Sequence, residues 1–155
     1  MHHHGYLWTG SKQRFDEEAL RRPPHPDAPP PEVRPELMQR YREVKSSFPV
    51  VDLPPLETAY WLIKPRALIR STWEEPKEAA DWLRERLAEY VPRFASGGDH
   101  DLTRLARLGE SAAEQLAWGG DVSYGCYLEQ PSFLSLALVC CSPNRARPEL
   151  TCPER

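Results

Sequence analysis

The sequence has no long hydrophobic run, and its longest uninterrupted apolar stretch covers only residues 136–141. A membrane-spanning helix needs about 20 apolar residues, so we expect no membrane as a partner. The first residues also lack a basic stretch followed by an apolar one, and therefore do not predict a signal peptide. Both absences favour a cytoplasmic location.

Positive charge is not in excess, because 20 lysines and arginines stand against 23 acidic residues and the formal net charge is -3. Domains that bind nucleic acid usually carry a basic excess, so this balance argues against a nucleic-acid partner. We also find no phosphate-binding loop, no cofactor fingerprint, no catalytic motif and no internal repeat. The sequence therefore points to no named chemistry.

The cysteines lack the spacing of a disulfide framework and include no closely spaced pair of the kind that zinc sites use. They are Cys126, Cys140, Cys141 and Cys152. We expect reduced thiols that are mostly buried, since free cysteine is among the most buried residue types. One of them, Cys126, could act as a nucleophile if a histidine and an acid lay beside it.

Proline, in contrast, is abundant, with 17 in a chain of 155 residues that fits a single domain. Prolines crowd residues 23–35, where they favour an extended conformation and prevent regular ladders. We therefore divide the domain into an N-terminal arm over residues 1–35, a globular core over 36–142 and a polar tail over 143–155 that frays. Within the arm, Tyr6–Thr9 could form a short strand and residues 16–22 a short helix.

Helical periodicity appears in three segments. An apolar stripe predicts a helix over residues 36–48 and consists of Leu37, Met38, Tyr41, Val44 and Phe48. Thr72 and Glu75 match a capping box, which starts a second helix that ends near Pro92. A turn at residues 96–99 leads to a third helix, capped by Asp99 or Asp101 and closed by Gly119. The short connection makes the last two helices antiparallel neighbours.

Strand patterns complete the fold class. Residues 121–129 alternate between apolar and polar, and residues 132–142 are apolar on both faces, so we expect a hairpin with a central strand. Residues 58–70 also alternate and predict an edge strand interrupted by Pro65, with a helix through Ile63 as the alternative. The expected fold is α+β: a small antiparallel sheet packed against an antiparallel helix pair, with an N-terminal helix and a proline-rich arm.

Three consecutive histidines, His2, His3 and His4, give the clearest indication of a metal. Neutral imidazole binds Zn, Cu and Ni, and a free amino terminus with histidine at position three can bind Cu(II) or Ni(II) through backbone amides. A closed zinc site would need a cysteine such as Cys126, Cys140 or Cys152 as well, with the N-terminus folded back. The alternatives are a remnant of a purification tag and a solvated start of the chain.

Two further groups are candidate binding residues. If residues 58–70 form a strand, one of its faces carries Lys64, Arg66 and Arg70, which could hold a phosphate or an acidic partner. The alternative is a solvated face paired with acids of a neighbouring helix. Aromatic residues near the junction of sheet and helices could line a small-ligand pocket or belong to the core. They are Tyr60, Trp61, Tyr124 and Tyr127.

Three classes of function follow from these features. The leading hypothesis is a small accessory or protein-interaction domain without its own catalysis, with a protein partner or a second copy as its ligand. The first alternative is a small metal- or cysteine-dependent enzyme that uses the N-terminal histidines or Cys126. The second alternative is a non-catalytic protein that binds a small ligand in the aromatic pocket.

Overall fold

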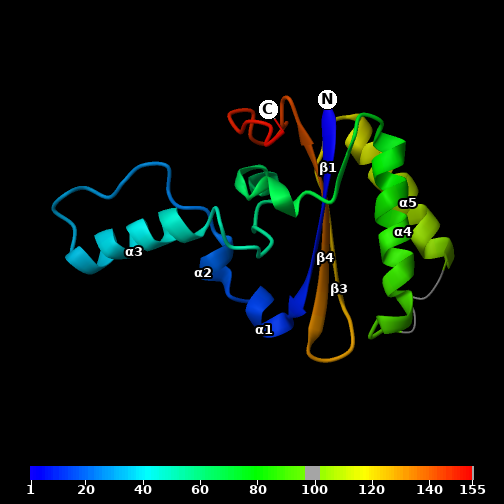
Figure 1. The fold of residues 1–155 in the computed structure, drawn as a ribbon, viewed down its shortest axis with the longest axis horizontal. Coiled ribbons are helices and arrows are strands. Elements are labelled where there is room, and N and C mark those ends of the chain that lie inside the picture. The colour runs from blue at the N-terminus through cyan, green and yellow to red at the C-terminus, as the bar shows by residue number, and fades with distance from the viewer. Residues whose placement is uncertain (97–101, 155) are drawn as a thin grey trace.

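A four-stranded antiparallel sheet forms the centre of the computed structural model, which describes residues 1–96 and 102–154 (Figure 1). The strands lie in the order β2-β1-β4-β3. Their bounds are β1 (His2–Ser11), β2 (Ser71–Trp73), β3 (Val122–Tyr127) and β4 (Ser132–Cys141). Helices pack against this sheet, so the predicted α+β class is confirmed.

The first strand is an interior strand of the sheet. β1 pairs with β4 along its whole length, from His2 opposite Cys141 to Ser11 opposite Ser132, and also pairs with β2. The expectation of an arm over residues 1–35 is therefore wrong for residues 2–11. Histidines and glycines at the start of this strand obscure the alternation that would have identified it, although both of its faces are largely buried.

The two long helices cover one face of the sheet. Helices α4 (Pro76–Tyr90) and α5 (Leu102–Ala117) pack against each other and run in opposite directions (Figure 1). The core between helices and sheet contains Leu83, Leu87, Leu105, Leu116, Leu134, Leu136 and Leu138. The short 3-10 helix η3 (Val91–Arg93) follows α4. The predicted turn at residues 96–99 and the predicted cap at Asp99 or Asp101 fall largely outside the described residues.

The predicted capping box does not form. Helix α4 begins after Glu75, which makes no side-chain cap, and Pro76 occupies the first turn. Thr72 instead lies in β2 opposite His4 of β1. The spacing of Thr72 and Glu75 matches the motif, but residues 71–73 form β2. The Thr72 hydroxyl therefore contacts the His4 ring and does not cap α4.

Short elements and the C-terminal segment cover the opposite face. They include α1 (Lys12–Phe15), α2 (Glu18–Arg21), η1 (Thr58–Ile63) and η2 (Arg66–Leu68). Trp61 of η1 stacks on Tyr6 of β1 with ring centroids 4.6 Å apart. The prediction of a strand over residues 58–70 is wrong, and the alternative of a helix through Ile63 describes η1. The backbone closes local hydrogen bonds: Lys64 N–H donates to the Trp61 carbonyl and Leu68 N–H to the Pro65 carbonyl.

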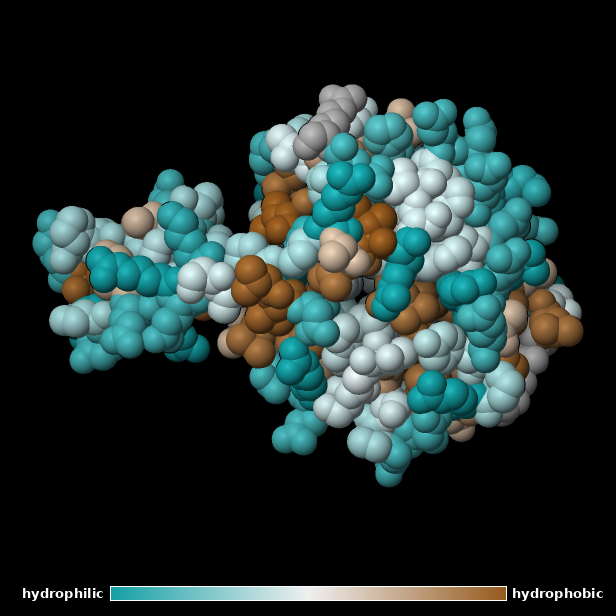
Figure 2. All heavy atoms as spheres, viewed as in Figure 1, coloured by the Kyte–Doolittle hydropathy of each residue, from teal (hydrophilic) through white to brown (hydrophobic). Residues whose placement is uncertain are grey.

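Helix α3 (Pro35–Ser47) projects from the body together with the proline-rich loop that precedes it. We call residues 22–47 the projection. The predicted helix is present, but within Pro35–Ser47 no residue is buried, so of the predicted apolar stripe only Phe48, just past the end of α3, joins the core. Figure 2 shows a largely hydrophilic surface on the projection and a narrow connection to the body. The expected core over residues 36–142 therefore lacks residues 36–47, and it also includes Tyr6 and Trp8 of β1.

None of the helices in the described ranges has both the length and the apolar character needed to cross a bilayer.

Candidate metal centre

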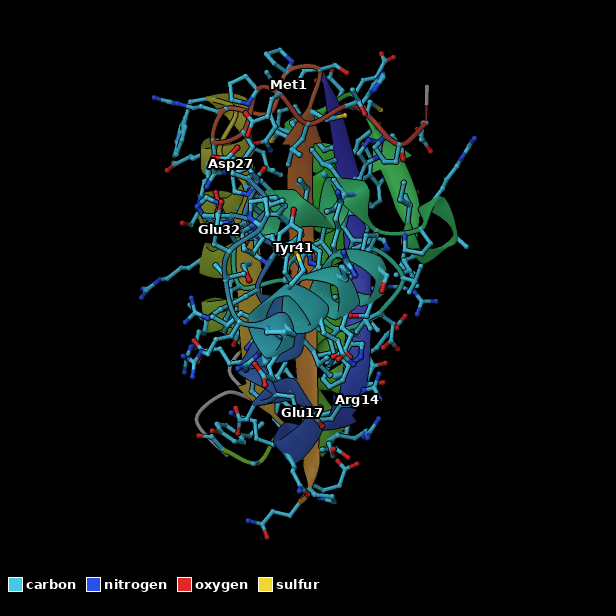
Figure 3. All side chains as sticks on the ribbon, turned by 90° about the vertical axis from the view of Figure 1, so that its left-hand side faces the viewer. Met1, Arg14, Glu17, Asp27, Glu32 and Tyr41 are labelled. Carbon is cyan, nitrogen blue, oxygen red and sulfur yellow. The ribbon has the colours of Figure 1, made fainter. Side chains whose placement is uncertain are left out.

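Two histidines and two cysteines meet at the end of the sheet where both termini lie (Figure 1). His2 and His4 come from β1, Cys141 ends β4, and Cys152 belongs to the C-terminal segment. One ligand atom from each lies within 4.8 Å of every other. Figure 3 labels Met1 at this same end of the sheet, far from Arg14 and Glu17.

Strand geometry explains why these side chains converge. Alternate residues of a strand point to the same face, so His2 and His4 share one face and His3 points to the other. The register places His2 directly opposite Cys141. Because Cys141 of β4 points to the same face of the sheet as His2 and His4, only Cys152 has to be brought in from outside the sheet.

The distances between ligand atoms suit a tetrahedral ion. The His4 Nε2 atom lies 3.1 Å from Cys141 Sγ and 3.5 Å from Cys152 Sγ. The His2 Nδ1 atom lies 3.8 Å from Cys152 Sγ. Zinc bonds of roughly 2.3 Å to sulfur and 2.0–2.1 Å to nitrogen place tetrahedral ligands about 3.6 Å apart. The cluster could therefore hold a metal ion with little rearrangement.

A chain of hydrogen bonds orients the His4 ring. The Thr72 hydroxyl donates to Glu154 Oε1 at 3.1 Å, so its oxygen accepts the proton of His4 Nδ1, 2.8 Å away. Nε2 then carries the lone pair that faces the two sulfurs. Metal-binding histidines usually donate their other ring nitrogen in this way, which fixes the tautomer and the ring orientation.

Burial sets the protonation of the site. His4 and Cys141 are fully buried, and burial lowers the pKa of the His4 imidazole, which keeps it neutral and able to act as a ligand. Burial, with the hydrogen bond to Cys152, raises the pKa of the Cys141 thiol to about 12. A metal must therefore displace a proton from Cys141 when it binds.

The Tyr6 hydroxyl is a second sign of a ligand at this site. It is buried, and among the described residues it has no hydrogen-bond partner. Tyr6 lies on the same face of β1 as His4, and burial together with the charges of Cys141 and Cys152 raises the pKa of its phenol. An unsatisfied buried hydroxyl costs about 1–3 kcal/mol. A metal-bound thiolate would give this hydroxyl an acceptor that a neutral thiol provides poorly.

The segment that carries Cys152 is held by its own contacts. The buried Asn144 side chain donates to the Asp121 carboxylate and to the Cys140 carbonyl. The Arg147 guanidinium makes a bidentate ion pair with Glu57, at 2.7 and 2.9 Å. The prediction that residues 143–155 fray is wrong for this part, because polar side chains fasten the segment where an apolar pattern is absent.

The remaining predicted metal residue lies apart from the cluster. His3 is buried on the helix-covered face, and its Nδ1 atom lies 3.2 Å from Cys140 Sγ. The structure thus brings two of the three histidines together and adds Cys141, which sequence reasoning did not select. The adjacent pair Cys140 and Cys141 at the end of an apolar strand, beside a His-x-His pattern in another strand, is the signal that could have suggested it.

The three residues of the predicted basic face do not share a face. Lys64 is buried and donates to the carbonyls of Phe48 and Val51, so it anchors the base of the projection. Arg66 and Arg70 are exposed. The expected strand face is absent because this segment forms two 3-10 helices.

The four aromatic pocket residues are dispersed. Trp61 is buried against Tyr6, and Tyr60 lies on the same side of the sheet. Tyr124 packs against the helix-covered core, whereas Tyr127 is exposed. These side chains therefore do not line one pocket.

Cys126 lies in the apolar core between the sheet and the helices and is 7% exposed. Such surroundings raise the cost of a thiolate, which is the reactive form of cysteine. Its position argues against a role as a nucleophile.

No family model, curated protein or solved structure matches this chain.

Proposed function

We propose that the protein binds one zinc ion through His2, His4, Cys141 and Cys152, and that this ion has a structural role in a non-catalytic accessory domain. The observation that carries the proposal is the convergence of two imidazole nitrogens and two sulfurs, from three segments of the chain, within 4.8 Å of one another. Two imidazoles and two thiolates form one of the common closed zinc sites.

The donor set and the backbone favour zinc over copper or nickel. Tetrahedral sites with two sulfur and two nitrogen ligands are typical of zinc. Amino-terminal binding of Cu(II) or Ni(II) would require backbone amides as ligands. The backbone of His3 is instead engaged between Cys140 of β4 and Trp73 of β2, and that pairing would have to break.

A structural role follows from the number and origin of the ligands. Four protein ligands leave no open coordination position for a substrate or an activated water, unlike a catalytic zinc site. His4 and Cys152 are separated by 148 positions in the sequence. The ion would therefore fasten the C-terminal segment to the sheet and close nearly the whole chain into one loop.

An accessory or interaction role is the broader part of the proposal. It is supported by the burial of Cys126 and by a projection whose helix buries none of its residues. Segments that extend from a rigid body in this way commonly serve contacts with other molecules.

Metal analysis of the full chain, made without an added histidine tag, tests the proposal. We expect one zinc per chain. The variant Cys141→Ser should lose the metal, while Cys140→Ser should retain it, because Cys140 points to the opposite face and a serine hydroxyl can still donate to the Gly120 carbonyl. Circular dichroism would verify that both variants fold. Metal-free protein, or equal metal content in both variants, would contradict the proposal.

A further inference from the structure

Two of the four cysteines lie side by side in the candidate metal centre. The Sγ atoms of Cys141 and Cys152 are within 4.8 Å of one another, and both residues are free thiols. A disulfide holds its sulfur atoms about 2.05 Å apart, so the two side chains have to approach each other by at most about 3 Å. Cys152 lies in a segment without helix or strand, which makes such a shift feasible.

The other two cysteines are not placed to pair with them. Neighbouring side chains in a strand point to opposite faces, so Cys140 faces the helices, where its Sγ atom lies 3.2 Å from His3 Nδ1. Cys126 lies opposite Leu134, six positions along β4 from Cys140, which corresponds to about 20 Å. Oxidation of the folded chain within one molecule is therefore directed to Cys141 and Cys152.

The pair also lies beside a hollow of about 540 Å³ at the C-terminal segment, which Figure 1 shows near the end of β4. Cys152 lines this hollow, whereas Cys141 is fully buried. A small neutral oxidant that enters the hollow therefore meets Cys152 first. The other described residues that line it carry no charge and are Ser142, Pro143, Pro148, Leu150 and Thr151.

We propose that Cys141 and Cys152 form a disulfide when the zinc-loaded chain meets hydrogen peroxide, and that the zinc ion leaves in the same reaction. The loss of zinc rests on the proposed function, whereas the disulfide depends only on the proximity of the two sulfur atoms. As a zinc ligand, Cys152 is a thiolate, which is the form of cysteine that reacts with peroxides.

The reaction has two steps. The Cys152 thiolate attacks one peroxide oxygen, the O–O bond breaks, and a sulfenic acid forms while hydroxide takes a proton from solvent and leaves as water. The Cys141 thiolate then attacks the Cys152 sulfur, so that the S–S bond forms, the S–O bond breaks and a second water leaves in the same way. Two thiolates are thus oxidised, one peroxide is reduced to two waters with two protons from solvent, and Zn²⁺ is released.

The C-terminal segment stays in place between the two steps. Polar contacts of Asn144 with Asp121 and Cys140 anchor its start and do not involve the metal ligands. They keep Cys152 near Cys141 when the ion leaves. The segment is then fastened to the sheet by zinc under reducing conditions and by a disulfide under oxidising conditions.

Oxidation of the zinc-loaded full chain with hydrogen peroxide tests the proposal. We expect non-reducing peptide mapping to find one disulfide, between Cys141 and Cys152, and a zinc-binding dye to detect one zinc released per disulfide. Cys140→Ser, the matched control, should behave like the unaltered chain, whereas Cys141→Ser and Cys152→Ser should form no disulfide within the molecule. If these two variants fail to fold, the peptide map of the unaltered chain still decides the question. Dithiothreitol with added zinc should reverse the change.

The same oxidation of the metal-free chain separates this inference from the proposed function. A chain that binds no zinc but forms this disulfide would support the thiol pair and overturn the release of zinc. A chain that binds one zinc but yields only sulfinic or sulfonic acids, a disulfide that includes Cys126 or Cys140, or a disulfide between two molecules would overturn the inference and leave the zinc site standing. Retention of zinc after the disulfide has formed would also overturn it.

Discussion

Removal of zinc should lower the stability of the whole domain and release its C-terminal segment. The link from His4 to Cys152 spans 148 positions, and a cross-link over such a loop restricts the unfolded chain by about 5 kcal/mol. Zinc at a thousand times its dissociation constant stabilises a native protein by about 4 kcal/mol through mass action. For a chain of this size we therefore expect chelation to lower the melting temperature by about 8–16 °C.

Thermal unfolding in buffered zinc and in chelator provides the assay. Cys140→Ser should keep the full zinc-dependent shift and Cys141→Ser should lose it. Hydrogen exchange adds a local readout: without zinc, amides near Cys152 should exchange faster, while those near Asn144 stay protected by its contacts with Asp121. The reasoning is refuted if zinc and chelator give the same melting temperature, or if both variants respond alike.

Four further outcomes are expected. Thr72→Val, which breaks the chain from His4 to Glu154, should weaken zinc affinity about 10- to 100-fold in a competition titration, whereas Thr151→Val should not. The raised pKa of Cys141 keeps its thiol protonated, so zinc has to displace that proton when it binds. This one proton should make the zinc affinity fall about tenfold for each pH unit of acidification. A pH-independent affinity would contradict the assignment of Cys141 as a zinc ligand. Burial lowers the pKa of Lys64 from 10.5 to about 8. Between pH 8 and 10.5 the unfolded chain therefore binds more protons than the folded one, so this residue makes the free energy of unfolding rise with pH in that range. Lys64→Met should flatten that rise in denaturant titrations. Replacement of residues 24–46 by a glycine–serine linker should change the melting temperature by less than about 4 °C, because α3 buries none of its residues, and a larger loss would show that the projection supports the core.

Periodic segments were the predictable part of the fold. The β3–β4 hairpin and the two long helices have apolar faces at regular spacing, and their types and approximate bounds followed from that spacing alone. β1 was underestimated because its first half consists of histidines and glycine, whose burial depends on partners more than 60 positions away, such as Thr72 and Cys141.

Predictions failed where tertiary contacts override a local pattern. Residues 58–70 alternate like a strand, but Lys64 is drawn inward by two carbonyl groups and the segment curls into 3-10 helices. Thr72 and Glu75 match a capping box, yet Thr72 serves the His4 ring.

The candidate site was only partly predictable for the same reason. A strand places His2 and His4 on one face, and the alternation of side chains along a strand predicts this from the sequence. Only the register of β1 against β4, and the course of the C-terminal segment, bring Cys141 and Cys152 to them.

We propose above that His2, His4, Cys141 and Cys152 together bind a zinc ion. X-ray absorption at the zinc edge, measured on the full chain, tests it most directly. We expect two sulfur ligands at about 2.3 Å and two nitrogen ligands at about 2.0–2.1 Å in the full chain and in Cys140→Ser, and no bound zinc in Cys141→Ser. A first coordination sphere of oxygen and nitrogen alone, or one that Cys141→Ser leaves intact, would contradict it.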